Sequence, residues 1–189
     1  MIAELGESRV KTILSSFSCP LNKDVEKFLK QDAIEFAKQR LASTHLVFTS
    51  YKGQVVLVGY FAIAYKVLTV KKSSLSNSLC KRIRKFATYS DNSYILPSPL
   101  IGQLGKNYTN KYNELITGDE LLYYAIEEVK KLQMIASGKV VYLECADNEK
   151  LISFYSRNGF VNFGKRKLEG DEVDLYSETH LVQMLRYIS

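Results

Sequence analysis

The sequence lacks the features that mark several protein classes. Its 189 residues include only 3 prolines and 10 glycines, while 46% are hydrophobic and 24% charged, which excludes a collagen-like or globally disordered chain. No apolar run approaches the roughly 18 residues of a membrane-spanning helix. The opening residues, MIAELGESRV, carry acids where a secretory signal has basic residues and then an apolar stretch. We therefore predict a cytoplasmic protein with no membrane segment, built as one domain over residues 1–189.

Cysteine and histidine are scarce, which limits metal and nucleophilic chemistry. The three cysteines, Cys19, Cys80 and Cys145, lie far apart, with no paired-cysteine or histidine-rich spacing around them. The sequence therefore indicates neither a disulfide framework nor a zinc site, and we expect buried thiols and no metal. Only two histidines, His45 and His180, are present, so a Ser–His or Cys–His catalytic pair has little support. Neither nucleotide-binding glycine motif, the P-loop or GxGxxG, occurs.

Positive charge is present but uneven. The chain has 26 Lys and Arg against 20 Asp and Glu. Residues 1–99 hold 15 basic and 7 acidic side chains, whereas residues 100–189 hold 11 and 13. The densest basic segment runs from residue 66 to 85 without an acid; its cations are Lys66, Lys71, Lys72, Lys81, Arg82, Arg84 and Lys85. Such a segment attracts nucleic acid or a polyanionic cofactor, or it is simply a solvated surface helix.

Apolar periodicity predicts alternating helices and strands in the first half of the chain. We expect a short strand at 11–17 and then a helix capped by Asn22 or Asp24. From His45 the residues become β-branched and aromatic on both sides of Lys52-Gly53, which predicts a hairpin with a long second strand. Within that strand Gly59 indicates a bulge or a close backbone approach. A basic helix over 79–87 follows.

The second half predicts a parallel crossover. The expected elements are a strand over 94–106, a helix through 121–136 ended by Gly138, a buried strand at 139–146, a helix over 148–158, a strand at 160–163, an acidic turn at 169–174 and a last strand near 181–188. Strand, helix and strand in this order imply a right-handed parallel connection. The whole order describes an α/β (α+β) mixed sheet with helices on both faces, unlike an alternating doubly wound sheet.

The most specific segment is NEKLISFYSRNGF, residues 148–160. Asn148 stands at the helix start, Tyr155 two turns further on, and Gly159-Phe160 turns the chain into a strand. This pattern resembles the N-x-x-A-x-x-F-Y-x-x-x-G-F signature of the GNAT acyltransferase superfamily, with Leu151 at the alanine position. The same residues also fit an ordinary amphipathic helix with an aromatic core pair and a glycine C-cap.

The element order extends this resemblance over residues 94–163. A strand, a loop, a helix, a parallel strand and the Asn/Tyr helix follow one another as in the GNAT superfamily, which implies a GNAT-like acyl-CoA N-acyltransferase fold. Residues 17–48 are loosely similar to the toxin-type branch of that superfamily. The resemblance implies acetyl-CoA as co-substrate and an amine as acceptor.

The pyrophosphate loop of the family, Q/R-x-x-G-x-G/A, is degenerate here. With Gly118 at the last glycine, Asn113 takes the Q/R position and Ile116 the first glycine. In the family, loop amides and a helix N-terminus hold the phosphates. Here Thr117 and Glu120 form an expected capping box, which would satisfy some of these amides internally. Acidic residues at the helix start repel phosphate, which Lys106 and Lys111 partly offset.

By resemblance, the cofactor-binding residues are Leu104, Gly105, Lys106, Lys111, Tyr112, Asn113, Ile116, Thr117, Gly118 and Asn148. An amide within Leu104–Lys106 would stabilise the oxyanion, and Gly105 would let pantetheine lie close to the main chain. Tyr155 would be the general acid that protonates the departing thiolate; a buried structural tyrosine is the alternative. Asn148 fits an N-cap equally well. No general base is identified, although Glu144 is a candidate.

Three functions therefore compete. The first is an acetyl-CoA-dependent N-acetyltransferase acting on a primary amine, in its toxin-type version the amino group of aminoacyl-tRNA, which the basic half suits. The second is a catalytically degenerate GNAT-fold module that binds nucleic acid or a protein partner, favoured by the degenerate loop. The third is an enzyme that acetylates a small amine or a protein N-terminus. The sequence leaves the choice between monomer and homodimer open.

Overall fold

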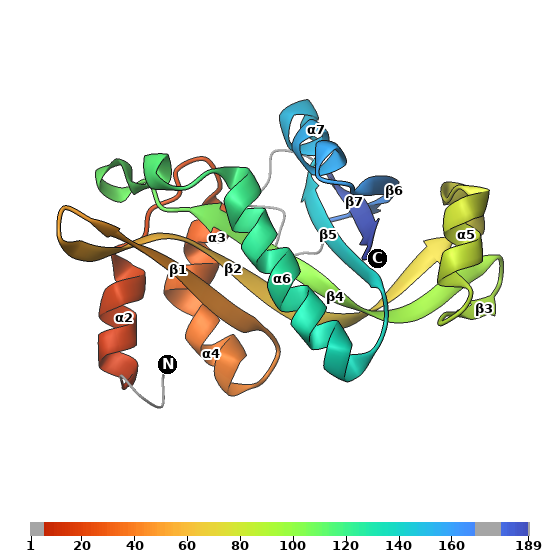
Figure 1. Ribbon diagram of the computed structural model, residues 1–189, viewed down its shortest axis with the longest axis horizontal. Coiled ribbons are helices and arrows are strands. Elements are labelled where there is room, and N and C mark those ends of the chain that lie inside the picture. The colour runs from red at the N-terminus through yellow and green to blue at the C-terminus, as the bar shows by residue number, and fades with distance from the viewer. Residues whose placement is uncertain (1–5, 169–178, 189) are drawn as a thin grey trace. The chain divides into compact units, whose positions relative to one another are not determined.

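The computed structural model describes residues 6–168 and 179–188 of the chain. Its helical elements are α2 (Glu7–Ser15), α3 (Lys23–Lys27), the π-helical η1 (Phe28–Asp32), α4 (Ala33–Lys38), the 3-10 turn η2 (Lys72–Ser74), α5 (Asn77–Ile83), the 3-10 segment η3 (Thr109–Leu115), α6 (Gly118–Ala136) and α7 (Glu149–Arg157) (Figure 1). The strands are β1 (Ser43–Tyr51), β2 (Gln54–Lys71), β3 (Thr88–Ser90), β4 (Ser93–Lys106), β5 (Val140–Ala146), β6 (Val161–Lys167) and β7 (His180–Tyr187). They form a mixed sheet of order β1-β2-β4-β5-β7-β6, with β3 paired to β4. The predicted α/β mixed-sheet class is confirmed.

The chain divides into two compact units. One comprises Met1–Ile63 with Gln103–Ala125, and the other Ala64–Gly102 with Ile126–Ser189. The elements β2, β4 and α6 pass from one unit into the other. The expectation of one domain over residues 1–189 stays a prediction.

The β1–β2 hairpin of the first unit is confirmed with its turn. Lys52 and Gly53 both have positive φ, 49° and 76°, as a two-residue turn of type I′ requires. The register shifts between Val47 and Phe48, opposite Gly59 and Leu57, so β2 carries one extra residue there. A Cβ added to Gly59 would lie 2.9 Å from the carbonyl oxygen of Gly105. Both predicted roles of Gly59, a bulge and a close backbone approach, are confirmed.

The first expected strand, at 11–17, is wrong. Residues Glu7–Ser15 form α2 instead, with Val10 and Leu14 buried on one face. These two residues are four apart, which fits a helical period better than a strand's alternation. The Glu7 carboxylate also pairs with Lys11 at 2.8 Å one turn later, which supports the helix.

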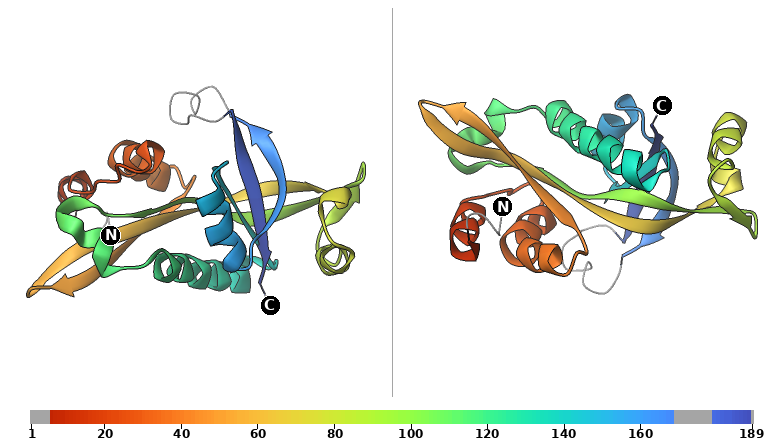
Figure 2. Two further views of the ribbon diagram at one scale, coloured as in Figure 1. Left: turned by 90° about the horizontal axis from the view of Figure 1, so that it is seen from above. Right: turned by 60° about the horizontal axis from the view of Figure 1, so that its bottom comes forward.

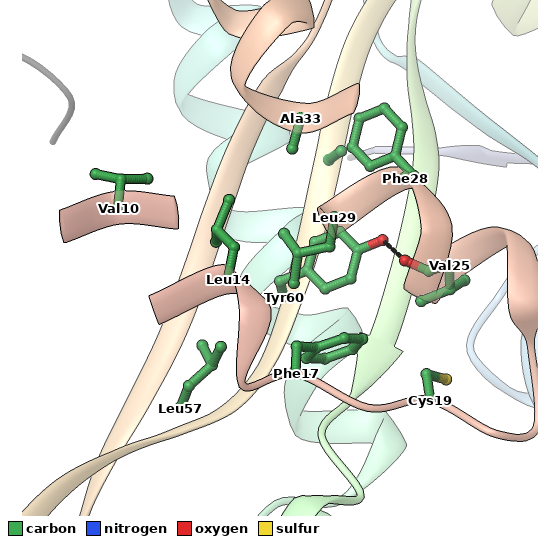
Figure 3. Packing of buried hydrophobic residues seen from close by; sticks show 11 residues of the cluster. Val10, Leu14, Phe17, Cys19, Val25, Phe28, Leu29, Ala33, Leu57 and Tyr60 are labelled. Carbon is green, nitrogen blue, oxygen red and sulfur yellow. Dashed lines mark hydrogen bonds between the residues drawn. The ribbon is translucent and has the colours of Figure 1, made fainter. Parts of the chain in front are cut away.

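A hydrophobic core joins the first three helices to the hairpin. Phe17 and Tyr60 are buried, with ring centroids 5.2 Å apart and edge to face. The Tyr60 hydroxyl donates a 2.5 Å hydrogen bond to the carbonyl of Val25 (Figure 3), so this buried polar group is satisfied. Helices α2 to α4 lie on one face of β1–β2, and the start of α6 lies on the other (Figure 2). This unit therefore has helices on both faces, as predicted.

The second unit is built around β5. This strand pairs with β7 along its whole length, antiparallel, and with β4 in parallel. Strand β6 pairs with the other edge of β7, and α7 packs against β5 and β6. The expected strands at 139–146, 160–163 and 181–188 and the helix at 148–158 are confirmed within a residue or two, apart from β6, which runs on to Lys167. The expected acidic turn at 169–174 lies outside the described residues.

One strand was not anticipated. Strand β3 pairs with the beginning of β4 through Thr88–Ser90 and Ser93–Ile95. Asp91 and Asn92 connect them with φ values of 47° and 57°, a conformation that Asp and Asn tolerate better than most residues. The dipeptide was therefore an available signal for a hairpin.

The structure also shows the state of the three cysteines and whether the described residues offer a metal site or a membrane-spanning helix. Cys19, Cys80 and Cys145 are all buried and free. No group of three His, Cys, Asp or Glu side chains with a metal-binding arrangement occurs within residues 6–168 and 179–188. In the same part of the chain, every helix falls short of the length and apolar character needed to cross a bilayer.

Candidate active site

The ladder between β4 and β5 is very short. It pairs Leu100 with Tyr142 and Ile101 with Leu143, whereas β4 itself continues to Lys106 and β5 pairs with β7 as far as Ala146. After Ile101, no further β4 residue pairs with β5 in the described part of the chain. Strand β4 therefore reaches the predicted cofactor residues Leu104–Lys106 after its ladder with β5 has ended.

Gly105 lets neighbouring residues pack directly against the backbone of β4, in the space that a side chain would fill. A Cβ added there would lie 2.3 Å from Cγ1 of Val25 and 3.5 Å from the ring of Phe17. Helix α3 thus occupies the space that the sequence suggested for pantetheine. The absence of a side chain at Gly105 is explained by close approach of α3, and a role for its backbone in cofactor binding stays a prediction.

Asn107 fastens the chain directly after β4, and the sequence did not mark it. The side chain is 1% exposed. Its Oδ1 accepts hydrogen bonds from the amides of Ser18 and Thr109, at 3.0 and 3.1 Å, and its Nδ2 donates to the Leu57 carbonyl at 2.9 Å. Its own amide donates to Val58 at 2.8 Å. Asn107 therefore ties the start of the loop to β2 and to the segment before α3.

The loop itself is held from within by Lys106. Its ammonium donates to the carbonyls of Asn113, at 2.8 Å, and Ile116, at 3.1 Å. Four of the predicted cofactor residues, Lys106, Asn113, Ile116 and Thr117, are thereby gathered around one turn. Asn110 and Lys111 adopt the left-handed conformation, with φ of 49° and 61°, which lets η3 turn back toward α6. Tyr112 is half-buried, and its ring lies 6.2 Å from that of Tyr51.

The predicted capping box at the start of α6 is confirmed. Glu120 accepts from the Thr117 amide at 2.7 Å, and Thr117 Oγ1 accepts from the Glu120 amide at 3.1 Å. The carboxylate also accepts from the Thr117 hydroxyl at 2.7 Å. The hydrogen bonds that the carboxylate accepts, first from the backbone amide and then from the hydroxyl, lower the pKa of Glu120. The carboxylate is thus charged at neutral pH beside the helix start. The box thus occupies the amides of Thr117 and Glu120, two of the donors at this helix start.

Helix α7 carries Asn148 and Tyr155 in the second unit. Asn148 is the N-cap, and its side chain accepts from the Lys150 amide at 2.9 Å. Tyr155 is 9% exposed and packs edge to face with Phe154 and Phe160, at 4.9 and 5.8 Å. Burial, and secondarily Cys145, raises the pKa of Tyr155. The hydroxyl is protonated at neutral pH, as in an ordinary tyrosine, so the raised pKa does not by itself distinguish a proton donor.

The hydroxyl of Tyr155 makes no hydrogen bond to any residue within 6–168 or 179–188. The hydroxyl oxygen is also not among the enclosed side-chain oxygens that lack a partner in the described part of the chain, so it is open to solvent although the ring is packed. Because water can bond this hydroxyl, the structural alternative stays open, and the role of Tyr155 as proton donor stays a prediction.

Glu144 is engaged structurally. Its carboxylate pairs with Arg166, at 2.7 Å, and accepts from Gln183 at 2.8 Å. Both oxygens are thus occupied by neighbours on β6 and β7. A carboxylate held in this way is poorly suited to take a proton from a substrate amine, so Glu144 is not assigned as a general base.

Comparison with known proteins identifies the fold. No protein-family model matches the chain, and no curated protein matches its sequence. Among solved structures, AtaT complexed with acetyl-methionyl-tRNAfMet is similar with 18% identity and a TM-score of 0.60, over 89% of this chain and 85% of that one. A tyrosine-to-phenylalanine mutant of KacT gives the same values. AtaTR bound with AcCoA gives 16% identity and a TM-score of 0.54, over 89% and 83%.

The chain has the GNAT fold. In this GNAT fold, β4 and β5 are the parallel pair whose ladder ends early, and α7 is the helix that resembles the Asn/Tyr signature. The sequence identified α7 because its signals are local. It missed Asn107, whose partners are 50 and 89 residues distant in the chain; only its place directly after a strand was visible.

Proposed function

We propose that this protein is an acetyl-CoA-dependent N-acetyltransferase that acts on the amino group of aminoacyl-tRNA. Such an acceptor places the reaction in the cytoplasm, where free buried cysteines are stable. The observation that carries the proposal is Tyr155, a protonated hydroxyl without a partner among the described residues, on the helix that follows β5 in a GNAT fold.

The proposed chemistry assigns one proton donor. The neutral amine of the substrate attacks the thioester carbonyl, a carbon–nitrogen bond forms, and the carbon–sulfur bond breaks. The thiolate that leaves takes the proton of Tyr155, and the amine releases its own proton to water. An amide within Leu104–Lys106 stabilises the negative charge on the carbonyl oxygen. The remaining edge of β4 supports pantetheine in the manner of an added strand.

The remaining cofactor residues are proposed to act through the backbone. The turn of Lys111, Tyr112, Asn113, Ile116, Thr117 and Gly118 is proposed to line the pyrophosphate, and Lys106 adds a positive charge. The amides of Thr117 and Lys111 are not among the donors, because they already donate to Glu120 and to the Tyr108 carbonyl. Asn148 is proposed to contact the cofactor in addition to capping α7. The acceptor assignment rests on similarity: AtaT has been solved with acetyl-methionyl-tRNAfMet and AtaTR with AcCoA.

The test is acetyl transfer from acetyl-CoA to charged tRNA, compared between wild type and Tyr155→Phe. We expect the variant to lose about 100-fold or more in rate, because one positioned proton donor is removed. The free energy of unfolding should be nearly unchanged, since phenylalanine keeps the ring contacts with Phe154 and Phe160. Tyr123→Phe, at a tyrosine 59% exposed on α6, is the matched control. Full activity of Tyr155→Phe would overturn the assigned role, and absence of transfer to charged tRNA by wild type would overturn the acceptor.

A second candidate function is a GNAT-fold module without catalysis, which binds nucleic acid or a protein partner. The capping box of Thr117 and Glu120 favours it, because it occupies loop amides and leaves a negative charge at the helix start. Calorimetry with acetyl-CoA separates the two functions. Micromolar binding supports the enzyme, and no binding at millimolar ligand supports the module.

A further inference from the structure

The excess positive charge of the chain resides in one short region. Residues 64–92, here named the basic arm, comprise the end of β2, η2, α5, β3 and the turn after it. They hold seven of the 26 basic residues and one of the 20 acidic residues, Asp91. The rest of the chain therefore has 19 of each sign. The net charge of +6 equals that of the basic arm.

All seven cations of the basic arm are exposed. They are Lys66, Lys71, Lys72, Lys81, Arg82, Arg84 and Lys85. Across residues 6–168 and 179–188, none of them forms an ion pair. By contrast Lys11, Lys30, Lys38, Lys130, Lys131, Lys165 and Arg166 all pair with carboxylates. Seven cations outside the basic arm thus have a carboxylate partner, whereas no cation of the basic arm has one within residues 6–168 and 179–188.

The basic arm is packed, so its charges are held in place. Cys80 and Ile83 of α5 are buried with Leu68 and Val70 of β2 and Tyr94 and Leu96 of β4. Figures 1 and 2 show α5 beside β3 and the end of β2. The Arg82 guanidinium lies 3.6 Å from the centroid of the Tyr187 ring, which fixes it further. Because Cys80 and Ile83 face the core, Lys81 and Lys85 point outward.

The chemistry of the exposed surface fits RNA. Hydroxyl side chains accompany the cations at Ser73, Ser74 and Ser78, and hydroxyls and cations together are the donors that contact phosphates. Tyr89 is 50% exposed within the same region, and an exposed ring can stack on an unpaired base. A membrane-binding helix needs large apolar side chains on its outer face, whereas Cys80 and Ile83 of α5 are buried and its Leu79 is half-buried.

We propose that the basic arm binds the phosphate backbone of the acceptor RNA and supplies much of its affinity. This inference deepens the proposed function and rests on it for the identity of the RNA as tRNA. Phosphate contacts by lysine and arginine release counterions, so the affinity must fall steeply as salt rises. The arm acts in binding alone and takes no part in the acetyl transfer.

The test measures the affinity of uncharged tRNA for Lys81→Glu/Lys85→Glu, by fluorescence anisotropy across a salt series. We expect at least about tenfold weaker binding at low salt, and a slope of log affinity against log salt reduced by about two. The matched control is Lys139→Glu/Lys167→Glu, which makes the same charge change at two exposed lysines of the same unit. Its affinity should stay within about threefold of wild type. Thermal unfolding confirms that both variants are folded.

The outcomes separate this inference from the proposed function. Equal loss of affinity in both double variants, or none in either, would overturn the role of the basic arm. Binding that depends on the arm for phosphatidylserine vesicles but not for tRNA would overturn RNA as the ligand. Arm-dependent tRNA binding without acetyl transfer by wild type would support the arm and reject the enzyme. Acetylation of charged tRNA by a protein whose tRNA binding does not depend on the basic arm would support the enzyme and reject the role of the arm.

Discussion

Two segments of this chain carry the resemblance to acyltransferases, and they are built in opposite ways. Residues 148–160 form a helix that contains its own N-cap, an aromatic pair and a glycine at its end. Most of its hydrogen bonds join residues only a few positions apart in the sequence. Residues 103–118 keep one of the family's loop glycines and are held by Asn107, Lys106 and a capping box. Several of these contacts reach β2 or the segment before α3. The first segment is therefore stabilised by contacts between sequence neighbours, and the second by contacts with distant parts of the chain.

This difference explains why one segment matches a family pattern and the other does not. A helix with a cap and an aromatic stripe depends on residue types at fixed spacing, so the spacing is visible. A loop that binds through backbone amides depends on where the chain is held, and many residue types can hold it. The missing glycines of the loop are therefore weaker evidence against cofactor binding than the charge of Glu120.

The largest expected effect is at Asn107. Asn107→Ala should lower the free energy of unfolding by about 3 kcal/mol, because it leaves the Ser18 and Thr109 amides and the Leu57 carbonyl without their partner. Urea unfolding measures this loss. Asn77→Ala, at an exposed position on α5, should change the same quantity by less than about 0.5 kcal/mol. A loss below about 1 kcal/mol at Asn107 would show that the loop is held in another way.

A smaller effect is expected at Gly105. Gly105→Ala should cost about 2 kcal/mol of unfolding free energy, since its new methyl group would overlap Val25 Cγ1. Gly102→Ala is the control on the same strand, because a Cβ there has its nearest neighbour at 3.9 Å. In a double-mutant cycle, Val25→Ala should make room and recover at least about 1 kcal/mol. Strictly additive costs in the cycle would contradict the close approach of α3.

The smallest expected effect is at Glu120. Glu120→Gln keeps an acceptor for the Thr117 amide but removes a negative charge from the start of α6. If the loop receives pyrophosphate, the affinity for acetyl-CoA should rise about two- to fivefold at low salt. Calorimetry measures this change. An unchanged or weakened affinity would place the phosphates elsewhere.

The same variant has a pH signature. Since the folded pKa of Glu120 lies below its usual 4.5, its carboxylate stabilises the fold above that pH. This stabilisation is lost as the pH falls through the lowered pKa, and Glu120→Gln should not show that loss. Unfolding measured between pH 6 and pH 3 checks the sign.

Most of the element order was predictable from residue patterns. The hairpin at Lys52-Gly53, the bulge at Gly59, the crossover through α6 and the capped helix α7 all have signals within a few residues. Two expectations differ from the structure. From the sequence we predict a strand at 11–17 although Val10 and Leu14 have helical spacing, and no strand at 88–90 despite the Asp91-Asn92 turn. For α2 the spacing of the buried Val10 and Leu14 favours a helix, whereas the three residues of β3 are exposed and give no apolar pattern.

The residues alone were enough to predict the α/β mixed sheet, the capped helix α7 and the uneven charge, because caps, periodicity and composition act over short distances. The acyltransferase fold was implied by the resemblance of residues 148–160 to a family pattern, and the role of Tyr155 as proton donor stays a proposal. Tertiary structure decided that Gly105 makes room for α3, that Asn107 holds the loop and that Glu144 is engaged by Arg166. It also decided that the seven cations of the basic arm are exposed and have no ion pair with any residue that the structure describes, whereas Lys30, Lys130 and Lys131 pair with acids one helical turn away. Contacts between residues distant in the chain depend on how the backbone is brought together, and no local pattern encodes that.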